Sequence, residues 1–271
     1  MKVVSGKKAV ITGAAMGMGK HLAAHFARDG ADLILVDIQE EKLEQTAAEL
    51  RRMGSGKVHT YVCDLAHRKD IYEMAERVRE EVGLVDIIVN NAGVVFGGEF
   101  LNVDDAKHQK CIDINLGAVM WVTKAFLPYI IAKREGHIVN MSSAAGLVGV
   151  PDLAVYSATK FAVIGFTESL REEIRRMGLS DVKLTTVCPS YVATGMFEGV
   201  KPPKLTRFLS PRGMARKIYE AMKNDEQIVM EPFMVKLTPL LKAMLPPDVL
   251  SLVSRLLGVG SSMKKWRGHQ G

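Results

Sequence analysis

The feature that most constrains the fold is a regular alternation of short apolar runs with amphipathic segments. Runs such as 32–38 (DLILVDI) are rich in branched side chains and apolar on both faces, which is typical of strands covered by helices on each side. Strands that alternate with helices pair in parallel, so the sequence predicts a doubly wound α/β sheet. The predicted strands lie at residues 8–13, 32–38, 58–65, 85–93, 136–143, 182–189 and 226–233.

The 271 residues contain no repeat and no low-complexity stretch, and their composition does not shift before about residue 195. A chain of this length can bury one complete α/β core. We therefore predict a single Rossmann-type domain over residues 1–271, with helices on both faces of the sheet. Within it we expect a substrate lid at 190–215 and a C-terminal helical extension at 234–271.

Cysteine usage and the first residues predict a cytoplasmic protein. Cys63, Cys111 and Cys188 are far apart and odd in number, so they predict small buried side chains and neither a disulfide framework nor a metal site. The N-terminal residues lack an apolar segment followed by a cleavage site. No uninterrupted apolar run reaches the ~18 residues of a membrane span.

Positive charge gathers in the last quarter of the chain. Residues 201–271 hold 13 Lys and Arg against 5 Asp and Glu, whereas residues 1–200 hold 23 against 25. The basic segment is apolar and carries no recognised nucleic-acid motif, so we expect no nucleic-acid partner. An anionic membrane surface or an acidic partner fits better, which predicts a peripheral membrane contact through this segment.

A glycine-rich turn follows the first predicted strand. Gly13, Gly17 and Gly19, with Met16 and Met18 among them, precede a helical segment. Such a turn lets backbone N–H groups approach a pyrophosphate at the positive end of the helix. A tight turn without a ligand is the alternative, because the spacing is GxxxGxG and not the commoner GxGxxG.

The second predicted strand ends at Asp37, which is followed by Ile38. A carboxylate in this place accepts hydrogen bonds from the adenosine ribose of a dinucleotide and repels the extra phosphate of NADP. Neither residues 14–18 nor the residues directly after Asp37 include an Arg or Lys that would offset the repulsion. The sequence therefore favours NAD over NADP, with an exposed strand-end carboxylate as the alternative.

The stretch YSATK places Tyr156 and Lys160 four residues apart in a predicted helix. Residues at this spacing share a helix face, so the phenol and the ammonium can reach the same small volume. The spacing alone is common and also describes a surface tyrosine beside a solvated lysine.

Together these motifs resemble the short-chain dehydrogenase/reductase family from about residue 5 to residue 195. The family's catalytic tetrad matches Asn115, Ser143, Tyr156 and Lys160 in order and spacing. Ser143 precedes Tyr156 by 13 residues, which selects it over Ser142. The resemblance implies cofactor contacts at Gly13, Met16, Gly17, Met18, Gly19, Asp37, Ile38, Asp64, Leu65, Asn91, Ala92, Gly93, Tyr156, Lys160, Pro189, Val192 and Thr194.

The resemblance also implies a role for each member of the tetrad. Tyr156 would exchange a proton with the substrate, because Lys160 and the charge of the nicotinamide lower the pKa of the phenol from its ordinary value of about 10. Ser143 would bind the substrate oxygen, so Ser143 and Tyr156 are the expected substrate contacts. Asn115 would keep a helix locally open, so that a water links Lys160 to solvent.

The loop after the sixth predicted strand departs from the family pattern at one position. Ser190 stands where the family usually has a glycine after Pro189. The resemblance implies that Val192 and Thr194, in the same loop, contact the nicotinamide carboxamide.

The C-terminal extension predicts two short apolar helices broken at Pro246 and Pro247. Three interpretations stay open: the helices pack on the domain or on another subunit, they wall an apolar substrate pocket, or they lie at a membrane interface. The segments 194–199 (TGMFEG) and 256–263 (LLGVGSSM) resemble the branch that holds retinol and hydroxysteroid dehydrogenases. That branch implies a lipophilic substrate.

The leading hypothesis is an NAD(H)-dependent oxidoreductase that transfers a hydride between nicotinamide and a lipophilic alcohol or ketone. An NADP-dependent 3-oxoacyl thioester reductase and a non-catalytic dinucleotide-binding scaffold are the alternatives. Helices expected at 103–132 and 154–177 have broad apolar faces. In the family such helices form the subunit interface, which implies a homodimer or homotetramer; packing of these faces on the sheet is the alternative.

Overall fold

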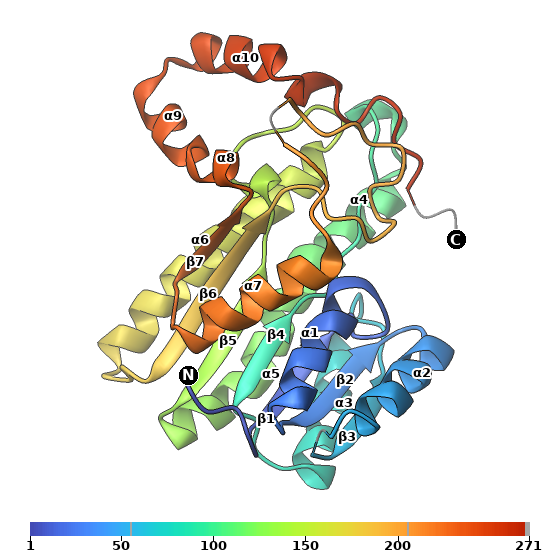
Figure 1. Ribbon diagram of the computed structural model, residues 1–271, viewed down its shortest axis with the longest axis vertical. Coiled ribbons are helices and arrows are strands. Elements are labelled where there is room, and N and C mark those ends of the chain that lie inside the picture. Colours follow the sequence, from blue (N-terminus) through green and yellow to red (C-terminus); the bar gives the residue numbers. More distant parts are fainter. Residues whose placement is uncertain (55, 205, 269–271) are drawn as a thin grey trace.

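In the computed structural model, which describes residues 1–54, 56–204 and 206–268, seven parallel strands form one sheet in the order β3-β2-β1-β4-β5-β6-β7 (Figure 1). The chain runs outward from β1 to β3 and then returns to place β4 on the other side of β1. A crevice forms at such a switch point, outside the carboxyl ends of the strands. The predicted doubly wound sheet is confirmed. The strands are β1 (Lys8–Thr12), β2 (Asp32–Asp37), β3 (Val58–Val62), β4 (Ile87–Asn90), β5 (Gly136–Met141), β6 (Val182–Pro189) and β7 (Ile228–Glu231).

Helices cover both faces of the sheet, and each face has its own apolar core. Side chains alternate between faces along a strand, so Leu35 of β2 packs on one side while its neighbour Ile34 packs on the other. This two-sided burial explains why the strands read as continuous apolar runs. One face carries α1 (Gly17–Arg28), α2 (Glu40–Arg51) and α7 (Pro211–Lys223), and the other carries α3 (Arg68–Glu81), α5 (Ala118–Lys133) and α6 (Ala154–Arg176).

The C-terminal extension forms a lobe at the carboxyl end of the sheet (Figure 1). It consists of α8 (Phe233–Lys236), α9 (Thr238–Met244) and α10 (Pro247–Leu256). The two predicted helices are α9 and α10, and Pro246 in extended backbone separates them. In the expected lid region, the described residues 190–204 and 206–210 form no helix or named strand. The buried side chains of α7, which follows, pack on α1.

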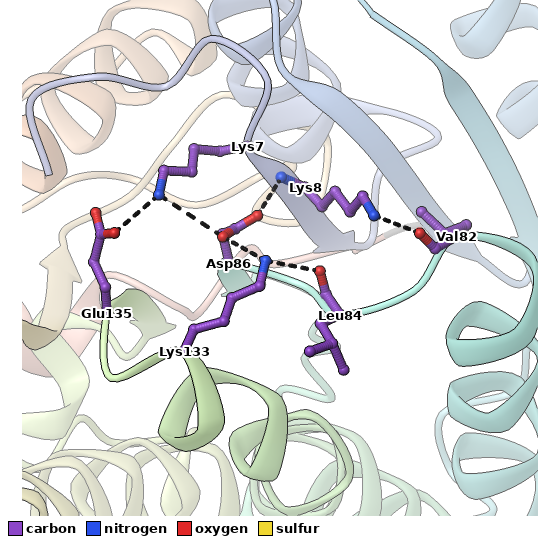
Figure 2. Close-up of polar contacts among 7 residues, drawn as sticks. All are labelled: Lys7, Lys8, Val82, Leu84, Asp86, Lys133 and Glu135. Atoms are coloured by element: carbon purple, nitrogen blue, oxygen red, sulfur yellow. Dashed lines mark hydrogen bonds and ion pairs between the residues drawn. The ribbon is translucent and has the colours of Figure 1, made fainter.

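Asp86 anchors the amino end of the sheet, where β1 and β4 begin (Figure 2). Its carboxylate accepts a hydrogen bond from the backbone N–H of Lys8 at 2.8 Å and one from Lys133 Nζ at 2.7 Å. Lys7 Nζ lies 3.8 Å from the same carboxylate and 3.1 Å from that of Glu135. Since the Asp86 side chain is only 7% exposed, these donors compensate for its loss of hydration.

We expect Asp86→Ala to lower the free energy of unfolding by about 2–4 kcal/mol, because it leaves the partly buried Lys8 amide without its acceptor and removes the anionic partner of Lys133. Glu135→Ala is the matched control. Its carboxylate is 53% exposed, so its removal is expected to change stability by less than ~0.5 kcal/mol. Urea unfolding at neutral pH measures both, and equal stabilities of the two variants would contradict the assignment of Asp86 as an anchor.

Candidate active site

The glycine-rich turn lies between β1 and α1, at the switch point of the sheet. Gly13 has a φ of +65°, and a Cβ there would lie 2.9 Å from Ala92 Cα. A Cβ on Gly19 would overlap the Gly13 carbonyl oxygen at 2.1 Å. Asn91 Nδ2 fixes the turn by donating to the carbonyls of Thr12 and Gly13 at 3.0 and 3.1 Å. Only glycine therefore fits at these positions.

The N-terminus of α1 faces this turn without a competing side chain. Its N-cap, Met16, makes no side-chain cap, and the first turn of α1 has no acidic residue. Backbone N–H groups at the start of a helix lack partners within the helix and carry partial positive charge. The N-terminus of α1 is therefore suited to an anionic group such as a pyrophosphate.

Asp37 is held rigidly at the end of β2. One carboxylate oxygen accepts the N–H of Ala15 in the glycine turn at 3.0 Å, and the other accepts the N–H of Gln39 at 3.0 Å. The side chain is buried yet lines the cleft. Each carboxylate oxygen keeps lone-pair capacity for a further donor such as a ribose hydroxyl. The sequence-based alternative of an exposed strand-end carboxylate is wrong.

The floor of the cleft is built from the NNAG segment after β4. Thr12 Oγ1 accepts the N–H groups of Asn91 and Ala92 at 3.0 and 3.1 Å. Asn90 Nδ2 donates to Asn140 Oδ1 at 2.8 Å, which ties β4 to β5 below the site. These bonds fix the backbone on which Ala92 and Gly93 line the cleft.

Asn115 occupies one π-helical turn, Asp113–Gly117, between α4 (Asp105–Ile112) and α5. The predicted local opening of this helix is therefore present. Asn115 Oδ1 accepts the Val94 N–H and its Nδ2 donates to the Val94 carbonyl, both at 2.8 Å. Asn115 is fully buried, so it acts on the site by fixing the backbone after Gly93.

Ser143, Tyr156 and Lys160 meet at the carboxyl end of β5. Ser143 Oγ accepts the Ala145 N–H at 3.1 Å, while the first turns of α6 supply Tyr156 and Lys160. Lys160 Nζ donates to the Met141 carbonyl at 2.9 Å and lies 5.6 Å from the centre of the Tyr156 ring. The interpretation of this pair as surface residues is wrong, because both side chains are buried.

The adjacent serine has a different function. Ser142 Oγ donates to the backbone carbonyl of Lys160 at 2.8 Å, which consumes its proton. Both serines line the cleft, and Ser143 is the one whose hydroxyl lies near Tyr156; its Oγ also lies 3.4 Å from the Pro189 carbonyl oxygen.

Burial dominates the acid–base properties of the pair. It raises the pKa of Tyr156 above its ordinary value, and a hydrogen bond from Ser143 opposes this only in part. Burial also lowers the pKa of Lys160 to about 8. The expected lowering of the pKa of Tyr156 depends also on the charge of the nicotinamide, so it stays a prediction for the loaded site.

The cleft at the switch point has a volume of about 350 Å³. It brings together every predicted cofactor and catalytic residue except Gly19 and Asn115, which act from behind its wall. Sequence reasoning missed several lining residues. No recognisable motif marks Gln39, Cys63, Val94 or Lys110. Met141 contributes a backbone carbonyl that any residue would supply. The missed lining residues are Gln39, Cys63, Val94, Lys110, Ile114, Met141, Met196 and Phe197, together with Ser142 and Ser190, which the sequence had singled out for other reasons.

A second cavity of about 140 Å³ shares Ser143, Tyr156, Ser190 and Phe197 with the cleft. Its far wall comes from the C-terminal lobe. The helices of that segment therefore wall an apolar pocket, which is one of its three interpretations and leaves the other two open. The lobe residues that line it are Met234, Val235, Thr238, Leu241, Leu250, Val253, Ser254, Leu257 and Val259.

Comparison with known proteins agrees with this geometry. The family model of the short chain dehydrogenases matches residues 7–204. The chain belongs to the short-chain dehydrogenase/reductase family. It is an oxidoreductase of the branch that contains retinol and hydroxysteroid dehydrogenases.

Two curated relatives and two solved structures illustrate the match. Epidermal retinol dehydrogenase 2 of Mus musculus is 42% identical over 99% of this chain and 88% of its own, and estradiol 17-beta-dehydrogenase 11 of Homo sapiens is 37% identical over 95% and 85%. A family member from Burkholderia phymatum in complex with NAD has a TM-score of 0.80 at 26% identity, covering 93% of this chain and 97% of its own. An alcohol dehydrogenase from Thermococcus sibiricus, complexed with 5-hydroxy-NADP, has a TM-score of 0.74 at 28% identity, covering 83% and 95%.

Proposed function

We propose that the protein transfers a hydride between NAD(H) and a lipophilic alcohol or ketone, with Tyr156 as the general acid–base. The observation that carries this proposal is the shared wall between the two cavities. Ser143 and Tyr156 line both the large cleft at the glycine turn and the apolar cavity under the C-terminal lobe. A substrate oxygen at that boundary would meet both hydroxyls.

The residues present fit a nicotinamide dinucleotide. The start of α1 would bind its pyrophosphate, Asp37 the adenosine ribose, and Lys160 the second ribose. When bound, the nicotinamide accepts or supplies the hydride and brings a positive charge in its oxidised form. The Tyr156 hydroxyl would take the proton of an alcohol or give one to a carbonyl. Ser143 Oγ would hold the substrate oxygen and stabilise the charge that develops there.

NAD is the proposed cofactor in preference to NADP. The Asp37 carboxylate is buried and fixed by two backbone N–H groups, so it cannot easily turn away from a 2′-phosphate. Its neighbours Ile38 and Gln39 are uncharged. Both arrangements oppose a second anion at this end of the cleft.

A lipophilic substrate is supported by the walls of the smaller cavity. Leu241, Leu250 and Val253 of α9 and α10 line it opposite Tyr156. Apolar walls with a few polar groups at one end are typical of sites that orient an apolar ligand. The relatives named as a retinol dehydrogenase and an estradiol dehydrogenase support the same substrate class.

Assembly and location complete the proposal. We propose a homodimer or homotetramer that uses the outer faces of α5 and α6. Among the described residues, one helical stretch, Asp105–Lys133, is long and apolar enough to cross a membrane by length and composition alone. It packs on the sheet through α5, and core helices of this kind meet the same criterion. The proposed location is the cytoplasm, with a peripheral membrane contact.

The C-terminal lobe is the proposed contact. Leu241 and Val253 line the cavity, whereas Leu240, Met244 and Leu256 of the same helices are 56%, 71% and 64% exposed. The helices thus present apolar side chains both to the cavity and to solvent. The lobe also carries exposed basic residues, including Lys236 and Arg255, which suit an anionic lipid surface.

Tyr156→Phe tests the chemistry. Loss of the phenolic proton is expected to lower kcat by at least ~100-fold while the Kd for NADH stays within ~twofold, because general acid–base groups contribute on that scale. Tyr72→Phe on α3 is the matched control and keeps full activity. Steroids, retinoids, aliphatic alcohols and 3-oxoacyl thioesters, each followed by nicotinamide absorbance, identify the substrate class. Undiminished turnover by Tyr156→Phe would refute the assigned role.

Asp37→Ala tests the cofactor preference. The wild-type protein is expected to bind NAD more tightly than NADP, and the substitution should reduce that ratio by ~10-fold or more, because it removes the repelling charge. Glu40→Ala removes a nearby exposed carboxylate and should leave the ratio unchanged. Fluorescence titration with both cofactors measures it, and tighter binding of NADP by the wild-type protein would overturn the proposal.

Flotation with lipid vesicles tests the membrane contact. Vesicles with phosphatidylserine are expected to retain the protein, and added salt should release it, because part of the attraction is electrostatic. Leu252→Ser combined with Leu256→Ser should weaken retention by ~10-fold or more. Leu101→Ser is the control, since Leu101 is 91% exposed and lies outside the lobe. Equal retention of both variants, or none by the wild type, would rule the surface out.

A further inference from the structure

Residues 257–267, the C-terminal clasp, lie against the irregular segment 190–204, the active-site loop. Trp266 Nε1 donates to the Met196 carbonyl at 3.1 Å. Main-chain bonds add to this contact at both ends of the clasp, so two segments far apart in the sequence are joined along their length (Figure 1). The main-chain bonds run from Lys201 N to Ser262 O at 3.0 Å, from Lys204 N to Leu257 O at 2.8 Å and from Arg267 N to Glu198 O at 2.9 Å.

A buried hydroxyl pair connects the clasp to the catalytic tyrosine. Ser262 donates its single proton to the Val259 carbonyl at 2.8 Å, so its oxygen accepts from the Tyr191 hydroxyl, also at 2.8 Å. The Tyr191 ring packs edge-on against Phe197 with centroids 5.0 Å apart, and Phe197 packs edge-on against Tyr156 at 6.2 Å. The position of the Phe197 ring beside Tyr156 therefore depends on the clasp.

The two segments approach too closely for side chains at the points of contact. Gly199 has a φ of +81°, and a Cβ there would lie 2.0 Å from the Lys265 carbonyl oxygen. The clasp also packs on a third segment, the one after β4, where a Cβ on Gly97 would lie 2.8 Å from Met263 Cε and 3.0 Å from Trp266 Cε3. Such contacts on two sides leave no room for the clasp to slide along the loop.

The active-site loop borders both cavities. Thr194 and Met196 line the cofactor cleft, Phe197 lines both, and Pro203 lines the apolar cavity. Ser143 and the first turns of α6 lie outside this loop, on elements held by the sheet. Movement of the loop would therefore change the shape of both binding cavities while leaving the proton-transfer groups in place.

We propose that Trp266 and Ser262 are positioning residues that hold the active-site loop in its binding-competent conformation. This inference rests on the proposed function, in that the two cavities bind NAD and substrate. If the clasp is released, only the fraction of molecules with a closed loop binds either ligand, and both apparent affinities fall by that fraction. The chemical step within the closed complex keeps its rate.

The test compares Trp266→Ala, Trp266→Phe and wild type. Trp266→Ala is expected to raise the Kd for NADH and the KM for the best substrate by ~10-fold or more, with kcat within ~twofold. Trp266→Phe keeps an aromatic ring over Gly97 and loses one neutral hydrogen bond, so both constants should stay within ~fivefold. Trp121→Ala, which removes the other indole from α5, is the matched control and should change neither constant.

Limited tryptic digestion gives a readout that needs no turnover. Cleavage after Lys204 and Arg207, followed by mass spectrometry, should be faster in Trp266→Ala and slowed again by NADH. Gly199→Ala is a second route to the same state, because its Cβ displaces the clasp without touching a cavity residue. Gly199→Ala also allows the proposal to be tested if Trp266→Ala fails to fold.

Two results would overturn the proposal. One is unchanged binding constants and cleavage rates in both Trp266→Ala and Gly199→Ala. The other is a loss of kcat with unchanged binding, which would place Trp266 in the chemistry and not in loop positioning. If the wild-type protein turned over none of the substrates, the proposed function would fail, whereas NADH binding and digestion would still decide the role of the clasp.

Discussion

The attachment of α6 to the end of β5 is the constraint on which the site depends. Lys160 Nζ donates to the Met141 carbonyl, and Ser142 Oγ donates to the Lys160 carbonyl, so side chain and backbone of one residue are both fixed to the strand. A Cβ on Gly146 would lie 2.7 Å from the Lys160 carbonyl oxygen, so the turn after β5 must also approach closely. The direction in which Tyr156 points follows from this attachment, because it lies one turn earlier on the same helix.

The two cavities meet at a wall that includes Ser143 and Tyr156. On the cleft side, the Asp37 carboxylate and the backbone of the glycine turn lie among apolar side chains, at the carboxyl ends of β1, β2 and β4. On the other side, the far wall consists mainly of aliphatic side chains of α9 and α10. A parallel sheet provides the first wall in any member of the fold, whereas the second requires a segment added after β7. In the proposed function, cofactor and substrate would therefore be recognised by different parts of the chain.

The fold and the cofactor cleft could be predicted because they depend on local patterns. Apolar runs indicate the strands. Glycines at 13, 17 and 19 indicate a tight backbone turn that no other residue allows. The neighbours of the site could not be predicted in the same way. Phe197 packs directly on Tyr156 and is linked through Tyr191 to Ser262 of the clasp, whereas the Met141 carbonyl that accepts from Lys160 is a backbone group present in every residue type. Such contacts join segments far apart in the chain, and no local pattern in a single sequence indicates them.

The acid–base expectation for Tyr156 depends on the charge that the cofactor brings. A phenol and an ammonium one turn apart in water would favour each other's charged forms, but here both are buried. In a medium of low dielectric, desolvation penalises the phenolate and the ammonium alike, so burial raises the pKa of Tyr156 and lowers that of Lys160. The same low dielectric makes the pair respond strongly to any charge placed in the cleft. A cationic ring near Tyr156 would then lower its pKa far more than a surface lysine could, so proton transfer would become favourable only in the loaded site.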